Sequence, residues 1–175
     1  RGSYIVNYTA TDVAGGVVNG NRTVVVDAPI ITLTGANPQY LQLESTYTEL
    51  GATSNGGENV TIEPSNVDMN TRGTYSVLYS STNVRGFVET VTRTVIVDAP
   101  IITLSGSGTY YASLDTPYID PGATSDGGET VTVDTSTLDM NTVGTYTITY
   151  SATDSNGFIG TATRTVVVDS PTITL

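Results

Sequence analysis

Residues 92–104 read TRTVIVDAPIITL, and the stretch recurs as NRTVVVDAPIITL at 21–33 and as TRTVVVDSPTITL at 163–175. The aspartates within it, Asp27, Asp98 and Asp169, are spaced 71 residues apart. A fixed internal period of this size indicates an array of one structural module.

The same spacing aligns the rest of the chain without a gap. It places LDMNTVGTYTITYSATD at 138–154 over VDMNTRGTYSVLYSSTN at 67–83. We therefore predict two complete repeats, flanked by the C-terminal part of a preceding repeat and the start of a following one. The predicted segments are 1–27, 28–98, 99–169 and 170–175. Partial repeats at both ends lead us to expect a natural chain that continues in both directions.

Within each repeat the main signal is a period of two. In YTITYSA at 146–152 every second residue is apolar, and threonine or serine lies between them. This alternation predicts a half-buried antiparallel strand. Similar patterns predict strands at about 30–34, 40–43, 46–53, 59–63, 73–82 and 87–97, and at the equivalent positions 71 residues later. Turn residues separate the strands, and no stretch has helical periodicity with caps.

A glycine two residues before a tyrosine opens the longest predicted strand of each repeat. The pairs are Gly73 with Tyr75 and Gly144 with Tyr146. This arrangement is typical of the tyrosine corner of immunoglobulin-like sandwiches, in which the phenol hydroxyl bonds to upstream backbone. The alternative is that both tyrosines only pack against the core. The predicted fold class is all-β, with tandem immunoglobulin-like β-sandwiches.

The repeat at 99–169 contains PIITLSG, YIDPGA, GTYTITYSATD and TRTVVVD in that order. It resembles the bacterial surface immunoglobulin-like repeat family. The resemblance implies a sandwich of the repeat's length, found in tandem in secreted and surface-anchored proteins, with no catalytic residues. The repeat at 28–98 departs from the pattern at three acids: Glu49 stands for Asp120, Asn55 for Asp126 and Asn83 for Asp154. These exchanges weaken any function assigned to those acids.

The composition excludes several function classes. With 17 acidic and 6 basic residues the net charge is -11, so the chain repels phosphate backbones and we expect no nucleic-acid partner. Histidine and cysteine are absent, which excludes an imidazole base, a thiolate nucleophile, a disulfide and an ordinary zinc site. All basic residues are arginine, so no lysine is present for a Schiff base or an isopeptide bond.

Carboxylates are therefore the remaining candidates for acid–base chemistry. The two pairs are Asp120 with Asp126 and Glu129 with Asp134, and all four lie in predicted turns or strand ends. This placement favours solvated turn acids. We predict that the chain is not an enzyme and has no catalytic, cofactor-binding or metal-binding residues.

A calcium site is the alternative to a chain without cofactors. Asp98 and Asp169 end the repeats, while Asp12 and Asp154 lie in the loop before the last strand. Clustered carboxylates and loop carbonyls are the ligands that calcium prefers. The spacing of an EF-hand loop is absent, and the same acids would keep an anionic chain in solution.

An arginine recurs in the last predicted strand of each repeat, at Arg22, Arg93 and Arg164. We expect it to pair with an acid at the rim of the sheet and to cover the end of the core with its stem. The alternative is binding of an acidic ligand. Three sequons are also present, and they are used only if the host glycosylates asparagine. They begin at Asn7, Asn21 and Asn59.

Only Asp98, Ala99 and Pro100 separate the last strand of one repeat from the first strand of the next. Proline fixes its own dihedral and restricts the residue before it, so we expect successive repeats to be held end to end. This predicts a structural spacer or filament that projects an adhesin tip or forms a surface fibre or virion appendage. The alternative is an accessory module that recognises a glycan or a protein through its loops.

The expected partners are neighbouring repeats of the same chain, with other copies in a fibre or a surface receptor as alternatives. No run of about 18 apolar residues is present, so we expect no membrane insertion in this segment. The predicted location is extracellular, at a cell or virion surface.

Overall fold

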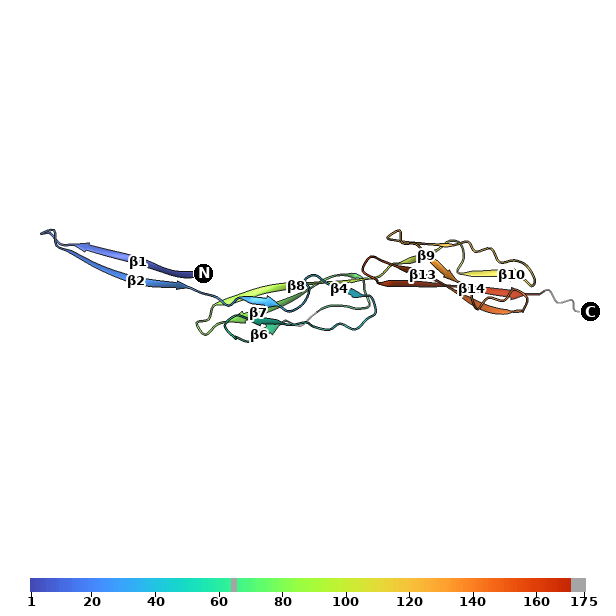
Figure 1. The fold of residues 1–175 in the computed structure, drawn as a ribbon, viewed down its shortest axis with the longest axis horizontal. Helices are drawn as coiled ribbons and strands as arrows, with labels where there is room; N and C mark the ends of the chain where they lie inside the picture. The colour runs from blue at the N-terminus through green and yellow to red at the C-terminus, as the bar shows by residue number, and fades with distance from the viewer. Residues whose placement is uncertain (64–65, 171–175) are drawn as a thin grey trace, which may run out of the picture. The chain divides into compact units, whose positions relative to one another are not determined.

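The computed structural model describes residues 1–63 and 66–170. In this part of the chain the regular elements are all β-strands, which confirms the predicted all-β class (Figure 1). Within the same residues, no helix is long and apolar enough to cross a membrane.

The N-terminal segment forms a two-stranded antiparallel sheet. Strand β1 (Gly2–Thr11) pairs with β2 (Val17–Val26), in a register that runs from Gly2 opposite Val26 to Thr11 opposite Val17. In the turn between them the Asp12 carboxylate accepts hydrogen bonds from the backbone N–H groups of Ala14 and Gly16.

The repeat at 28–98 has six strands in two sheets. The larger sheet has the order β4-β8-β7-β6, and β3 pairs with β5. The strands are β3 (Ile31–Leu33), β4 (Gln39–Gln42), β5 (Ala52–Ser54), β6 (Val60–Ile62), β7 (Gly73–Thr82) and β8 (Val88–Asp98). Every second residue of β7 and β8 points into the core, which is formed by Val77, Tyr79, Val95 and Val97.

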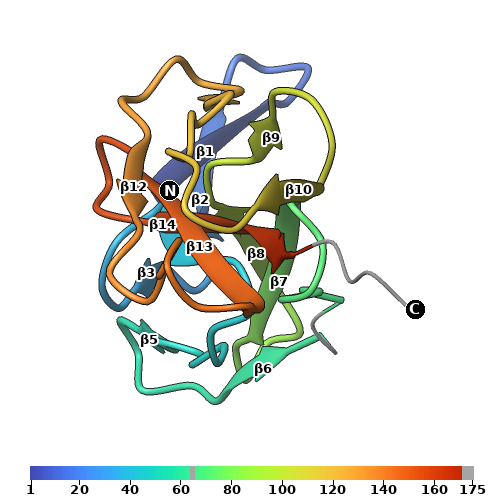
Figure 2. The same ribbon diagram turned by 90° about the vertical axis from the view of Figure 1, so that its right-hand side faces the viewer.

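The repeat at 99–169 repeats this arrangement. The larger sheet, whose strands are labelled in Figure 2, has the order β10-β14-β13-β12. Strand β11 pairs with β9. The strands are β9 (Ile102–Leu104), β10 (Thr109–Ser113), β11 (Ala123–Ser125), β12 (Thr132–Asp134), β13 (Gly144–Thr153) and β14 (Ile159–Asp169). Strand β10 runs parallel to β14, and the buried core comprises Ile148, Tyr150, Val166 and Val168.

The strand predicted at 46–53 is wrong over most of its length. Only Ala52 and Thr53 belong to a strand, β5, and the residues before them form no ladder. Gly51 has φ 76°, a left-handed conformation that interrupts an extended chain. Side chains satisfy the backbone there instead, because Gln39 Nε2 donates to the Thr48 carbonyl and the Glu49 carboxylate accepts from the Gly51 N–H.

Tyr146 forms the predicted corner contact. It is the third residue of β13, and its hydroxyl donates to the carbonyl of Thr142, at 2.8 Å. The same side chain packs against the buried core of its repeat. Tyr75 is the third residue of β7, the equivalent place in the other repeat.

The described chain forms two compact units. The first comprises Arg1–Gln39, Thr48–Val67 and Tyr75–Val95, and the second comprises Tyr40–Tyr47, Asp68–Thr74 and the chain from Ile96 onward. The linker at 98–100 therefore lies within the second unit, together with the segments at 40–47 and 68–74. The predicted segment boundaries at 27, 98 and 169 stay a prediction.

Candidate functional site

Each complete repeat contains one fully buried arginine. Arg93 and Arg164 both have an exposed fraction of 0%. Arg164 lies in β14 on the same face as Val166 and Val168, so strand alternation directs it into the core. The predicted position at the sheet rim is wrong. The core position could be inferred from the alternation, because Arg164 is separated from Val166 and Val168 by even numbers of residues.

The Arg164 guanidinium connects the two sheets of its repeat. Its Nη2 donates to the carbonyls of Ser105 at 2.8 Å and Gly122 at 3.1 Å, and its Nη1 donates to the carbonyl of Ser107. Ser105 directly follows β9, and Gly122 directly precedes β11. A planar group with fixed donors thus ties the smaller sheet to β14.

A tyrosine and an acid complete the contact. Arg164 Nε donates to the Tyr150 hydroxyl at 2.9 Å, and this hydroxyl donates to Asp120 Oδ1 at 2.6 Å. Asp120 Oδ1 also accepts from the Gly122 N–H at 3.0 Å and the Tyr118 hydroxyl at 3.2 Å. Burial alone would raise the pKa of Asp120, but these hydrogen bonds and the charge of Arg164 hold it below its ordinary value.

The repeat at 28–98 builds the same contact with a longer acid. Arg93 Nε donates to the Tyr79 hydroxyl at 2.9 Å, and Tyr79 donates to Glu49. The same Arg93 nitrogen lies 3.9 Å from Glu49 Oε1. The exchange of Asp120 for Glu49 therefore preserves the role of the carboxylate.

The proposed acid–base pairs have separate structural partners. Asp126 accepts from the Ile101 N–H, whereas Asp120 is bound by Tyr150 and its own turn. Glu129 accepts from the Ser125 hydroxyl, and Asp134 accepts from the Ser136 N–H at 2.9 Å. In the described residues these acids order turns and strand ends.

The acids of the calcium alternative are also used locally. Asp12 and Asp154 each accept N–H groups of their own hairpin turns, and Asp98 and Asp169 each accept the N–H of the following residue. No three acids of the described chain lie together as a set that could hold a metal ion. A calcium site stays an untested alternative.

The linker residues are packed into the fold. The Leu43 N–H donates to the Asp98 carbonyl at 2.9 Å, and Asp98 Oδ1 accepts from the Ala99 N–H at 2.9 Å. Ala99 is 5% exposed, and Pro100 is buried. A Cβ added at Gly160 would lie 1.9 Å from the Pro100 carbonyl oxygen, so only glycine fits beside the linker.

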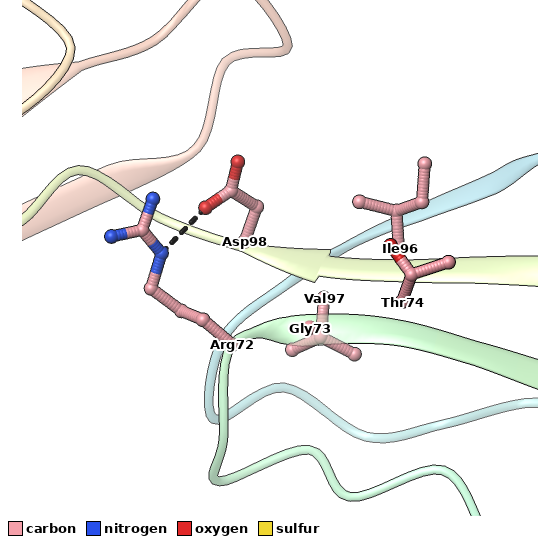
Figure 3. Close-up of a pocket in the computed structure, with 6 residues that line it drawn as sticks. All are labelled: Arg72, Gly73, Thr74, Ile96, Val97 and Asp98. Carbon is pink, nitrogen blue, oxygen red and sulfur yellow. Dashed lines mark hydrogen bonds and ion pairs between the residues drawn. The ribbon is translucent and has the colours of Figure 1, made fainter.

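Arg72 makes a contact at the linker that the sequence did not predict. Its Nε donates to Asp98 Oδ1 at 2.7 Å, as drawn in Figure 3, and its Nη1 donates to Asp126 Oδ2 at 2.6 Å. The Ile101 N–H, together with Arg72, lowers the pKa of Asp126 from its ordinary value. An open hollow of about 310 Å³ lies beside Arg72 and Asp98. The available signal was the 71-residue spacing of Arg1 and Arg72.

The sequons lie on strands or beside them. Asn7 and Asn21 face each other in the register of β1 and β2, and Asn59 is an exposed residue directly before β6. Their glycosylation stays untested. Arg22, the third recurrent arginine, is exposed on β2.

These features define a class of protein: all-β chains built from tandem immunoglobulin-like sandwiches. A family model described as "Bacterial surface protein, Ig-like domain" matches residues 31–97 and 102–168. The chain belongs to this family, as its motifs predicted. Membership of the family suggests an extracellular or surface location and a structural or binding role. Members of the family are generally non-catalytic. The predicted virion surface is not supported.

Comparison with curated proteins finds no match. Among solved structures, the lipoprotein BT2262 from Bacteroides thetaiotaomicron is 19% identical, with 80% of each chain covered and a TM-score of 0.35. The M60 catalytic domain with the CBM51-1 and CBM51-2 domains from Clostridium perfringens ZmpB is 13% identical, with a TM-score of 0.32. That match covers 97% of this chain and 33% of the other. Both scores are too low to carry an argument.

Proposed function

We propose that this chain is a non-catalytic extracellular spacer, in which tandem sandwiches joined by packed linkers form an adhesin stalk or a surface fibre. The observation that carries the proposal is the linker itself. Ala99 and Pro100 are buried, and the Asp98 carbonyl accepts the Leu43 N–H. A linker held by backbone bonds and packing has few of the conformations open to a flexible tether.

The strand geometry supports a load-bearing role. Strand β10 pairs in parallel with β14, from Thr109 opposite Thr165 to Ser113 opposite Asp169. Force applied along two parallel paired strands in opposite directions loads their hydrogen bonds together in shear. The buried Arg164 adds side-chain bonds between the two sheets, so separation of the sheets also breaks its bonds to the carbonyls of Ser105 and Gly122.

Use of the two partly buried acids supports the absence of catalysis. An acid–base pair must be free to exchange protons with a substrate. Asp120 instead accepts three hydrogen bonds within its own repeat, and Glu49 is bound to Tyr79 and Gly51. These contacts assign the two carboxylates to stabilisation of the sandwich.

The test is the length of arrays of increasing copy number. Strand β14 has 11 residues, which at about 3.3 Å each gives a repeat of about 35 Å. Chains with two, four and six complete repeats are compared by small-angle scattering. We expect the maximum dimension to grow by a constant 35–40 Å or so per repeat. Growth that levels off with copy number would contradict the spacer and favour an accessory binding module.

A further inference from the structure

The contacts around the linker use two side chains from the repeat at 28–98. The guanidinium of Arg72 bonds to Asp98 and Asp126, as described above. The amide of Gln42 forms two bonds with the first residue of β14: its Nε2 donates to the Ile159 carbonyl at 2.9 Å, and its Oε1 accepts the Ile159 N–H at 2.7 Å. Gln42 thus replaces the peptide group of a neighbouring strand. All of these residues lie in the second compact unit.

The repeat at 99–169 lacks both side chains. The residues 71 positions after Gln42 and Arg72 are Ser113 and Val143. Serine is too short to bond both backbone groups of a strand residue, and valine has no hydrogen-bond donor. Val143 is 54% exposed. The second repeat therefore does not carry the surface that the first one offers to its successor.

The equivalent arginine of the N-terminal segment uses a different acid. Arg1 Nη2 lies 3.1 Å from Glu89 Oε2 and donates to the Pro29 carbonyl at 2.6 Å. Glu89 stands where the next repeat has Gly160, and Asn55 stands where it has Asp126. A side chain at 160 would collide with the Pro100 carbonyl. The two arrangements are therefore exclusive.

We propose that Gln42 and Arg72 form a copy-specific interaction surface, whose partner is a following sandwich of the same family with Asp at position 126 and Gly at position 160. The order of repeats is then encoded by residues beside the linker. This inference rests on the proposed spacer function, because it identifies the side chains that hold the linker between two repeats. It goes further because the linker is then packed only where both adjoining repeats carry the matching residues.

The strength of the contact comes from its arrangement. The Arg72, Asp98 and Asp126 side chains are 33–40% exposed, and an isolated pair of such charges contributes little. However, Asp98 and Asp126 also accept the N–H groups of Ala99 and Ile101. One guanidinium therefore connects two carboxylates that are fixed to the backbone on either side of Pro100.

The test transplants the residues of the second repeat into the first. In the full chain, Gln42→Ser and Arg72→Val introduce the side chains found at Ser113 and Val143. The measurement is the ¹⁵N order parameter of the Ala99 and Ile101 amides. We expect a fall from about 0.85 to below about 0.6, while the melting temperature of each repeat is unchanged.

Two further variants give the matched controls. Arg85→Val removes an arginine from the exposed turn after β7 and should leave the order parameters as they are. Asp126→Asn introduces the residue found at Asn55. The new amide oxygen can still accept the Ile101 N–H, as Asn55 accepts the Ile30 N–H at 2.8 Å. This variant should match the effect of Arg72→Val, and the two combined should add nothing further.

The outcomes separate the two proposals. A rigid wild-type linker that stays rigid in the transplanted variant overturns the copy-specific surface and leaves the spacer intact. A mobile linker in the wild type overturns both proposals. Equal loss of order in Arg85→Val would show a general effect of charge, and would also overturn the surface.

Discussion

The repeats at 28–98 and 99–169 share their buried arginine and differ at one position of the edge strand, Gln39 in β4 and Tyr110 in β10. In the second repeat Tyr110 packs edge-to-face against Tyr118, with ring centroids 5.1 Å apart. In the first repeat Gln39 takes that position, and its Oε1 is buried without a hydrogen-bond partner. A buried carbonyl oxygen without a hydrogen bond lowers the stability of the fold, whereas an aromatic pair at the same position raises it. The first repeat thus has a polar defect in its core that the second repeat lacks.

Loss of the buried arginine should have the largest effect on this comparison. Arg164→Met removes the guanidinium that donates to the carbonyls of Ser105, Ser107 and Gly122. We expect a loss of about 3–5 kcal/mol in the free energy of unfolding of the second repeat. Arg93→Met should act similarly on the first repeat. Denaturant unfolding measures both losses. A loss below about 1 kcal/mol in either repeat would contradict the claim that the buried arginine is a main source of stability.

Removal of the carboxylate should have a smaller effect that depends on pH. Asp120→Asn weakens the bonds from Tyr150, Tyr118 and Gly122, and we expect a loss of about 1.5–3 kcal/mol at neutral pH. The folded-state pKa of Asp120 lies below the ordinary value of 3.8. Its contribution is therefore complete above about pH 5 and is lost as the pH falls through the folded-state pKa. Equal acid sensitivity of wild type and variant would contradict this assignment.

The polar defect in the first repeat predicts a stabilising exchange. Gln39→Tyr introduces the residue found at Tyr110, opposite Tyr47, which is the equivalent of Tyr118. We expect the first repeat to gain about 1 kcal/mol, because the unpaired Oε1 is removed and an aromatic pair can form. The reverse exchange, Tyr110→Gln, should destabilise the second repeat. Thermal unfolding of both variants checks the pair, and shifts of the same sign would refute the explanation.

The corner tyrosine should have the smallest effect. Tyr146→Phe removes the 2.8 Å hydrogen bond to the Thr142 carbonyl, which lies at an exposed site. We expect a loss of about 0.5 kcal/mol, at the low end for a hydrogen bond. An unchanged unfolding midpoint would reduce Tyr146 to a packing residue.

The sequence predicts the long strands and the fold class because alternation survives along β7, β8, β13 and β14. It fails at 46–53, where side chains of Gln39 and Glu49 bond to the backbone and no ladder forms. Those contacts join residues that the alternation does not relate. The burial of Arg93 could have been predicted from its parity with Val95, but the chemistry of an arginine favours a rim position. The contact of Arg72 could not be predicted, because its partner Asp126 lies 54 residues away and no sequence pattern relates the two positions.

The proposed spacer requires that the packed linker holds successive repeats in one arrangement. The chain contains no cysteine, so Ser76→Cys and Thr147→Cys place two spin labels at exposed, equivalent positions of β7 and β13 without other changes. The distance distribution between the labels is measured by pulsed electron paramagnetic resonance. We expect one narrow peak, no broader than the spread of the labels themselves. A broad or multiple distribution would show that the linker is a hinge and would contradict the proposed spacer.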